Sequence, residues 1–193
     1  MARWEPDARG RLEKAAMELF QERGYARTTV EDIAARAGLT ERTFFRYFSD
    51  KREVLFSGSA SLEAALVDTV AGAAADATPM EIVGQAFEAA GAALEAQREL
   101  AYVRARWKLL SAHAELRERE LIKLASLAGS VASALRARGV AEPAASLAAE
   151  AGVAVFKIGF ERWMGDKKPR SFAKHIREAM DALRVVTGAA RAG

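Results

Sequence analysis

One stretch, residues 28–48, constrains the fold more than any other part of the chain, because it carries start and stop signals for two short helices in immediate succession. Thr29 is placed to cap the first helix, with Asp32 three residues on as a weaker form of the capping box. Gly38 ends that helix, since a residue without Cβ adopts the left-handed conformation of a helix end at little cost. Thr40 then caps the second helix. Two helices joined by so tight a turn cross steeply, as in a helix-turn-helix.

The second helix of this stretch has two different sides. Phe44, Phe45 and Phe48 form an aromatic side that we expect to be buried. The other side carries hydroxyls and both positive charges: Thr40, Glu41, Arg42, Thr43, Arg46 and Tyr47. Such a side suits a recognition helix, whose N-terminal residues meet base edges while its hydroxyls and amides meet phosphates. Spacing alone leaves open the alternative of an ordinary amphipathic helix with solvated charges.

The wider pattern resembles the N-terminal domain of the TetR family of transcriptional regulators, over roughly residues 9–66. The resemblance is carried by four motifs: Thr29-x-x-Asp32-Ile33-Ala34, Ala37-Gly38-Leu39-Thr40, Thr43-Phe44-Phe45-Arg46-Tyr47-Phe48 and Asp50-Lys51-Arg52-Glu53-Val54-Leu55. It implies a ligand-responsive DNA-binding regulator. Such a protein is expected to act as a homodimer on a palindromic double-stranded operator, as a repressor that a small molecule releases.

The resemblance and the residue chemistry together select candidate DNA-binding residues. Those expected at bases and phosphates are Arg42, Thr43, Arg46 and Tyr47, and those expected at phosphates alone are Thr29, Thr40 and Lys51. Family members usually have Tyr where Phe45 stands, and that hydroxyl commonly touches a phosphate. Tyr47 and Lys51 are therefore expected to carry more of the backbone binding here. Lys51 should lie at the start of a helix capped by Asp50, where amides and an ammonium suit a phosphate; a solvated lysine is the alternative.

Composition favours an all-α protein, because 51% of the residues are hydrophobic, alanine is abundant and β-branched runs are few. We expect a three-helix helix-turn-helix domain at residues 9–56, whose fourth helix runs unbroken from Asp50 to about residue 71. Residues 57–193 should form a helical bundle for effector binding and dimerisation. Residues 1–56 hold 11 Lys and Arg against 10 Asp and Glu. DNA binding must therefore depend on a local arrangement of cations rather than on bulk charge.

Several function classes find no support in the sequence. There is no cysteine, and the two histidines, His113 and His175, are not paired at helical spacing, so we expect no disulfide, metal or other cofactor. We also expect no catalytic site. The N-terminus does not resemble a signal peptide, and no run approaches the ~20 apolar residues of a membrane helix, so a cytoplasmic protein is expected. An enzyme and an architectural DNA-binding protein without an effector remain the alternatives.

The chain is apolar nearly all round from Ala144 to Met164, which predicts a helix buried on every side, by a partner chain or around an internal cavity. Gly152 and Gly159 would let another helix come close. Ser171 is placed to cap a last helix. Family members commonly dimerise through their last two long helices as a four-helix bundle. The expected interface residues are Val153, Phe160, Met164, Ile176 and Leu183.

The effector pocket is expected among the C-terminal helices. An apolar cavity could be lined by Phe87, Leu94, Trp107, Leu110, Phe156 and Trp163, with Tyr102, Arg106 and His113 on one helix face beside it. Apolar walls with one cationic end suit an apolar ligand bearing an acid group. The alternative is that these aromatics fill the core and Arg106 is solvated. Residues 115–119 and 160–163 resemble actinobacterial members of the family, including the mycofactocin-type regulators, some of which respond to fatty acyl compounds.

Overall fold

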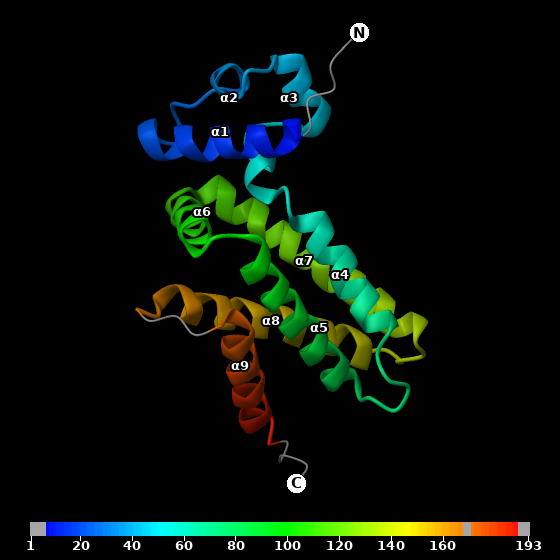
Figure 1. The fold of residues 1–193 in the computed structure, drawn as a ribbon. Helices are drawn as coiled ribbons and strands as arrows, with labels where there is room; N and C mark the ends of the chain where they lie inside the picture. The colour runs from blue at the N-terminus through cyan, green and yellow to red at the C-terminus, as the bar shows by residue number, and fades with distance from the viewer. Residues whose placement is uncertain (1–6, 168–170, 189–193) are drawn as a thin grey trace. The chain divides into compact units, whose positions relative to one another are not determined.

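The computed structural model describes residues 7–167 and 171–188, which form nine α-helices, one 3₁₀-helix and no strand (Figure 1). The predicted all-α fold is therefore confirmed. The elements are, in order, α1 (Ala8–Arg23), α2 (Val30–Arg36), α3 (Glu41–Tyr47), η1 (Glu53–Phe56), α4 (Ser59–Ala71), α5 (Pro79–Gln97), α6 (Leu100–Ala112), α7 (Ala114–Ala137), α8 (Ala144–Gly165) and α9 (Phe172–Val186).

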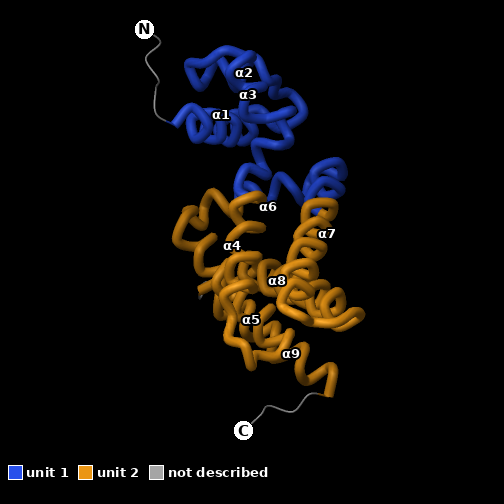
Figure 2. Tube along the Cα trace, turned by 90° about the vertical axis from the view of Figure 1, so that its right-hand side faces the viewer, with its two compact units in different colours: residues 1–58, 105–120 blue, residues 59–104, 121–193 orange. Residues whose placement is uncertain are grey.

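The chain divides into two compact units, and the division is not the predicted one (Figure 2). The N-terminal unit contains residues 1–58 together with 105–120, and the C-terminal unit contains residues 59–104 and 121–193. The first boundary lies two residues beyond the predicted end of the helix-turn-helix domain. The sequence analysis assigned the segment 105–120 to the effector domain. Its contacts place it in the N-terminal unit instead. It comprises the end of α6 and the start of α7.

In the N-terminal unit, α1 supports the two helices that follow it. Its apolar stripe, at helical spacing, is fully buried: Leu12, Ala16, Leu19 and Phe20. The helix ends at Gly24, which adopts a positive φ of 85°. α1 packs against α2 and η1, and α2 packs against α3. The apolar stripe of α1 thus fixes the position of the helix-turn-helix.

The predicted unbroken helix from Asp50 to about residue 71 is wrong. Asp50 does cap this segment, since its carboxylate accepts hydrogen bonds from the amides of Arg52 at 2.7 Å and Glu53 at 3.2 Å. The segment then forms only the short η1, and α4 starts anew at Ser59. Gly58 lies in the gap between them, and glycine disfavours helix more than any residue except proline. A single rigid helix therefore does not connect the two units here.

Residues 53–71 also bear on the expectation that no run is apolar enough for a membrane helix. By length and composition alone this segment is apolar enough to cross a membrane, so the expectation is corrected. Core helices of soluble proteins can be equally long and apolar. Leu66 and Val70 of α4 are fully buried in the core of the C-terminal unit, which accounts for their apolar character.

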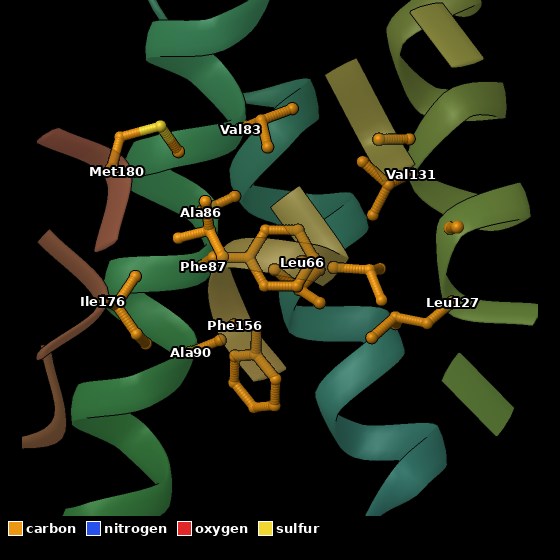
Figure 3. Packing of buried hydrophobic residues seen from close by; sticks show 14 of the residues in the cluster. Leu66, Val83, Ala86, Phe87, Ala90, Leu127, Val131, Phe156, Ile176 and Met180 are labelled. Carbon is orange, nitrogen blue, oxygen red and sulfur yellow. The ribbon is translucent and has the colours of Figure 1, made fainter. Parts of the chain in front are cut away.

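The C-terminal unit is built around α5. Thr78 caps this helix in a full capping box with Glu81, and Pro79 occupies its first turn. α5 contacts α4, α8 and α9. Figure 3 shows the ring of Phe87 pointing into a cluster with Leu66 of α4 and Val131 of α7. The unit therefore has one hydrophobic core with α5 at its centre.

Candidate DNA-binding surface

The helix-turn-helix is fixed by local hydrogen bonds at the predicted positions. Thr29 and Asp32 form a reciprocal capping box, in which the Thr29 hydroxyl accepts from the Asp32 amide at 3.1 Å and the Asp32 carboxylate accepts from the Thr29 amide at 2.9 Å. The amide hydrogen bond from Thr29 holds the pKa of Asp32 below its usual value. Gly38 ends α2 with a φ of 67°, and Thr40 caps α3 by accepting from the Thr43 amide at 3.2 Å.

The aromatic side of α3 is only partly as predicted. Phe44 and Phe48 are buried, with ring centroids 5.5 Å apart. Phe45 is 55% exposed, so its predicted burial is wrong. Adjacent residues on a helix point about 100° apart, so α3 cannot turn Phe44 and Phe45 toward the same neighbouring helix. Three aromatic residues in five positions exceed the width of the side that is covered.

The exposed side of α3 brings four predicted DNA-binding residues together. Arg42 and Arg46 are exposed, while Thr43 and Tyr47 are half-buried. The Arg46 guanidinium donates to the Tyr47 hydroxyl at 3.0 Å and lies 4.8 Å from the centre of its ring. Such a contact orients both side chains before any ligand arrives. Their contacts to bases and phosphates stay a prediction.

The two threonines predicted at phosphates act as helix caps. Both Thr29 and Thr40 are exposed, and in each the hydroxyl oxygen accepts a hydrogen bond from an amide of the helix that it caps. A hydroxyl that accepts in this way still has its own hydrogen to donate. The Thr40 oxygen also lies 3.1 Å from the Thr43 hydroxyl. Capping is therefore compatible with the predicted phosphate contacts, which remain predictions.

Lys51 has partners that the sequence did not indicate. Its ammonium donates to the carbonyls of Tyr25 and Thr28, at 2.9 Å each, and lies 4.4 Å from the centre of the Tyr25 ring. Tyr25 is itself buried, and burial raises the pKa of its hydroxyl. Lys51 thereby ties down the loop between α1 and α2, directly before the Thr29 cap. Its predicted role at a phosphate must compete with these carbonyls.

We predict that Lys51→Ala will lower the free energy of unfolding by about 2 kcal/mol, because it removes a charged donor shared by two carbonyls. Urea denaturation followed by circular dichroism measures the loss, and Lys14→Ala, at an exposed lysine of α1, is the matched control. A phosphate role predicts instead that the salt slope of DNA binding falls by about one unit. A variant with full stability and that lower slope would contradict the structural role.

Residues 105–120 attach to the N-terminal unit through side chains that were predicted at the effector. Arg106 donates to the Leu55 carbonyl at 2.6 Å and pairs with Glu120 at 3.7 Å. The His113 ring lies 5.0 Å from that of Tyr25. In the same unit Leu110 is buried and Trp107 is 36% exposed. The alternative of a solvated Arg106 does not hold, because its guanidinium has a backbone carbonyl and a carboxylate as partners; its predicted place at an effector stays a prediction.

One ion pair in this unit was missed altogether. Arg119 of α7 donates to Glu53 of η1 at 2.6 Å, which raises the pKa of Arg119. Next to this pair, the Arg52 side chain donates to the Asp50 carboxylate at 2.7 Å and holds its pKa below the usual value. A pair separated by 66 positions leaves no local signal in the sequence.

The other predicted pocket residues lie in the C-terminal unit and largely pack as core. The Phe87 and Phe156 rings are 5.6 Å apart, and Trp163 stacks on Phe172 at 4.8 Å. Leu94 is half-buried against the same core. Tyr102 is half-buried, with the Arg98 guanidinium 5.0 Å from the centre of its ring. The predicted set is thus divided between two units, and a pocket formed by it remains a prediction.

The predicted interface residues are mostly used within the chain. Val153, Met164 and Ile176 are buried in the core of the C-terminal unit, and Phe160 and Leu183 are half-buried against it. The exposed large apolar side chains of α8 and α9 are different residues: Leu147, Ile158, Val185 and Val186. Successive residues of a helix point about 100° apart, so a residue one or two positions from a buried residue faces another side. The predicted positions face the core, and their neighbours face outward.

Comparisons with known proteins agree with this geometry. Residues 12–57 match the family model described as bacterial regulatory proteins, tetR family. The HTH-type transcriptional regulator TcmR of Streptomyces glaucescens is 36% identical over 81 residues, which cover 42% of this chain and 36% of that protein. The chain thus matches about a third of the length of this curated relative. The matched family and this relative are regulators rather than enzymes, in agreement with the sequence prediction.

Two solved structures share the fold. The TetR-family repressor FadR of Thermus thermophilus, in complex with lauroyl-CoA, is 24% identical with a TM-score of 0.56, covering 96% of this chain and 98% of its own. The complex of SmeT with triclosan is 22% identical with a TM-score of 0.65, covering 93% of this chain and 90% of its own. SmeT is the repressor of the multidrug efflux pump SmeDEF in Stenotrophomonas maltophilia. At these identities the likeness concerns the fold alone.

Proposed function

We propose that this protein, whose residues 12–57 belong to the TetR family of bacterial regulatory proteins, is a DNA-binding transcriptional repressor controlled by a small-molecule effector. One observation carries the proposal. The capped turn from α2 to α3 presents Arg42, Thr43, Arg46 and Tyr47 on one short helix. A recognition helix needs cations and hydroxyls on its exposed side for base edges and phosphates. Such a regulator would act in the cytoplasm, where its DNA is.

The DNA partner follows from symmetry. A homodimer with twofold symmetry binds two half-sites of opposite direction, so the operator should be near-palindromic. The two copies of α3 should lie about one helical turn of DNA apart, ~34 Å or somewhat more. Of the two arginines on α3, Arg46 donates to the Tyr47 hydroxyl, whereas Arg42 makes no hydrogen bond or ion pair with another described residue. Arg42 is thus the cation of α3 most available for a base or phosphate.

The effector is proposed from the C-terminal unit. FadR was solved with lauroyl-CoA and SmeT with triclosan, and each of these two ligands has an apolar part. By analogy of fold we propose a small apolar effector near Phe87, Leu94, Tyr102, Phe156 and Trp163, acidic or neutral. It must bind the DNA-free conformation more tightly than the DNA-bound one, or it shifts nothing. Arg106 bonds within the N-terminal unit, so the proposal does not depend on it.

Selection from random DNA duplexes tests the function. We expect a near-palindromic consensus, bound with an affinity that falls steeply as salt rises. A thermal-shift screen with acyl-CoAs, fatty acids and aromatic acids should then yield compounds that raise the melting temperature and release the selected duplex. Arg42→Ala should lose sequence preference, whereas Lys14→Ala, on α1, should keep it. Failure to enrich any sequence would refute the DNA-binding proposal, and enrichment without any releasing compound would favour an architectural protein.

A further inference from the structure

The most exposed large apolar side chain of the described residues 7–58 is Phe45, at 55%. Single exposed apolar residues are common on protein surfaces, so exposure alone says little. The position says more, because Phe45 lies on α3, three residues from Arg42 and adjacent to Arg46. Residues three apart on a helix are neighbours on its surface. The ring is therefore a surface neighbour of Arg42, and the second exposed arginine, Arg46, is the next residue along α3.

The ring is also held in place. Phe45 packs edge-on against Phe44, with centroids 5.5 Å apart and planes at 83°. Phe44 is fully buried and fixed by the core of the N-terminal unit. An edge-to-face contact of this kind is favourable beyond the area that it buries. Phe45 thus has a restrained ring that loses little conformational freedom when something packs against it.

The chemistry of the ring restricts what it can recognise. Phenylalanine has no hydrogen-bonding atom, so it cannot bind a phosphate oxygen or the polar edge of a base. In the major groove the one apolar group on a base edge is the 5-methyl group of thymine. Deoxyribose offers apolar surface too, but along the backbone, where it carries no sequence information. The Phe45 ring matches the thymine methyl group better than deoxyribose, since α3, as a recognition helix, would enter the major groove.

We propose that Phe45 contacts the 5-methyl group of one thymine in each half of the bound DNA and thereby specifies thymine at that position. The proposal rests on the proposed function, because it requires α3 to lie in the major groove. Phe45 then reads a base by shape, where its neighbours Arg42 and Arg46 offer hydrogen bonds.

The experiment replaces each thymine of the selected duplex, one position at a time and in both half-sites, by deoxyuridine. This change removes the methyl group and leaves every hydrogen-bonding atom of the base in place. For the unmodified protein we expect one thymine position at which the replacement weakens binding by about fourfold per half-site, as for the loss of one buried methyl group. For Phe45→Ala we expect the thymine and deoxyuridine duplexes to bind equally at that position.

The control is Leu121→Ala, which removes an equally exposed apolar side chain, at 57%, from α7 in the C-terminal unit. It should retain the full preference for thymine. If deoxyuridine has no effect at any position on the unmodified protein, the proposal is wrong and Phe45 contacts sugar or solvent. If Phe45→Ala keeps the thymine preference, another residue reads the methyl group. Neither result affects the proposed function, which fails only if no sequence is selected in the first place.

Discussion

Replacing Gly152 with alanine should lower the free energy of unfolding by about 2–3 kcal/mol, the usual cost of forcing extra atoms into a packed core. Gly152 is buried on α8, where a Cβ would stand 2.5 Å from Cε2 of Phe87 and closer still to Val83. Both residues belong to α5 and are fully buried. The Phe87 ring packs against Phe156 at 5.6 Å, so it cannot turn aside without disturbing the core (Figure 3).

Gly129→Ala is the matched control for this change. Gly129 lies within α7, is exposed, and has nothing within 4 Å of the position that a Cβ would take. Alanine there should raise stability by about 0.5–1 kcal/mol, because it restricts the unfolded chain and favours helix. Urea denaturation of both variants, followed by circular dichroism, measures the two changes. Equal stabilities for Gly152→Ala and the parent protein would mean that α8 can move away from α5.

The helix-turn-helix could be predicted because its signals are local. Each of these signals acts over three or four residues. Thr29 and Thr40 accept the hydrogen bonds expected of helix caps, and Gly38 adopts the positive φ expected at a helix end. A capping box needs only the helix that it starts, so no other part of the chain can overrule it. The four buried residues of α1 were predictable for the same reason, since helical spacing alone puts them on one side.

The errors concern what covers each side of a helix, which depends on distant residues. Phe45 is exposed because none of the described helices of the N-terminal unit covers its side of α3, and nothing in the sequence around it indicates this. Lys51 and Arg106 were expected to face ligands, yet both donate to backbone carbonyls more than 20 positions away. Every residue has a backbone carbonyl, so the type of the partner residue gives no indication of such a contact. Contacts of this kind cannot be deduced from residue type and spacing.

The helix α8 shows both outcomes at once. It was expected to be buried on every side, with its glycines allowing another helix to approach. The close approach is real, but the neighbours come from the same chain: α5 at Gly152 and Ile176 of α9 at Gly159. The remaining side of α8 is uncovered in the single chain. It carries Leu147, Ala151, Ala154 and Ile158, spaced four, three and four residues apart.

That uncovered side suits a second copy of the chain. Ile158 and Leu147 are 52% and 65% exposed, and Val185 and Val186 on the neighbouring α9 exceed both. α8 and α9 pack closely against each other, so their exposed apolar residues can contribute to one surface. The family resemblance implies a four-helix bundle made from these two helices of each copy. We therefore propose the dimer interface at the exposed residues instead of the buried Val153, Met164 and Ile176.

Ile158→Arg should then raise the dissociation constant of the dimer by about a thousandfold. A twofold interface contains each residue twice, so two unpaired charges would be buried by one substitution. Each costs about 2 kcal/mol or more, and every 1.4 kcal/mol is a factor of ten in the constant. Sedimentation equilibrium measures the change. DNA affinity should fall with it, because a monomer reaches only one half-site.

The control for this variant is Gln85→Arg, which adds the same side chain at an exposed polar position of α5. It should leave both association and stability unchanged. Ile158→Arg should keep the melting temperature of the isolated chain, since Ile158 contributes little to the core, whereas Val153→Ala should lower it by removing buried methyl groups. Unimpaired association of Ile158→Arg would place the interface elsewhere. Val153 is buried by its own chain, so a loss of association in a Val153 variant could result from unfolding. A loss of association in a folded Ile158→Arg variant has no such explanation and would assign the interface to α8.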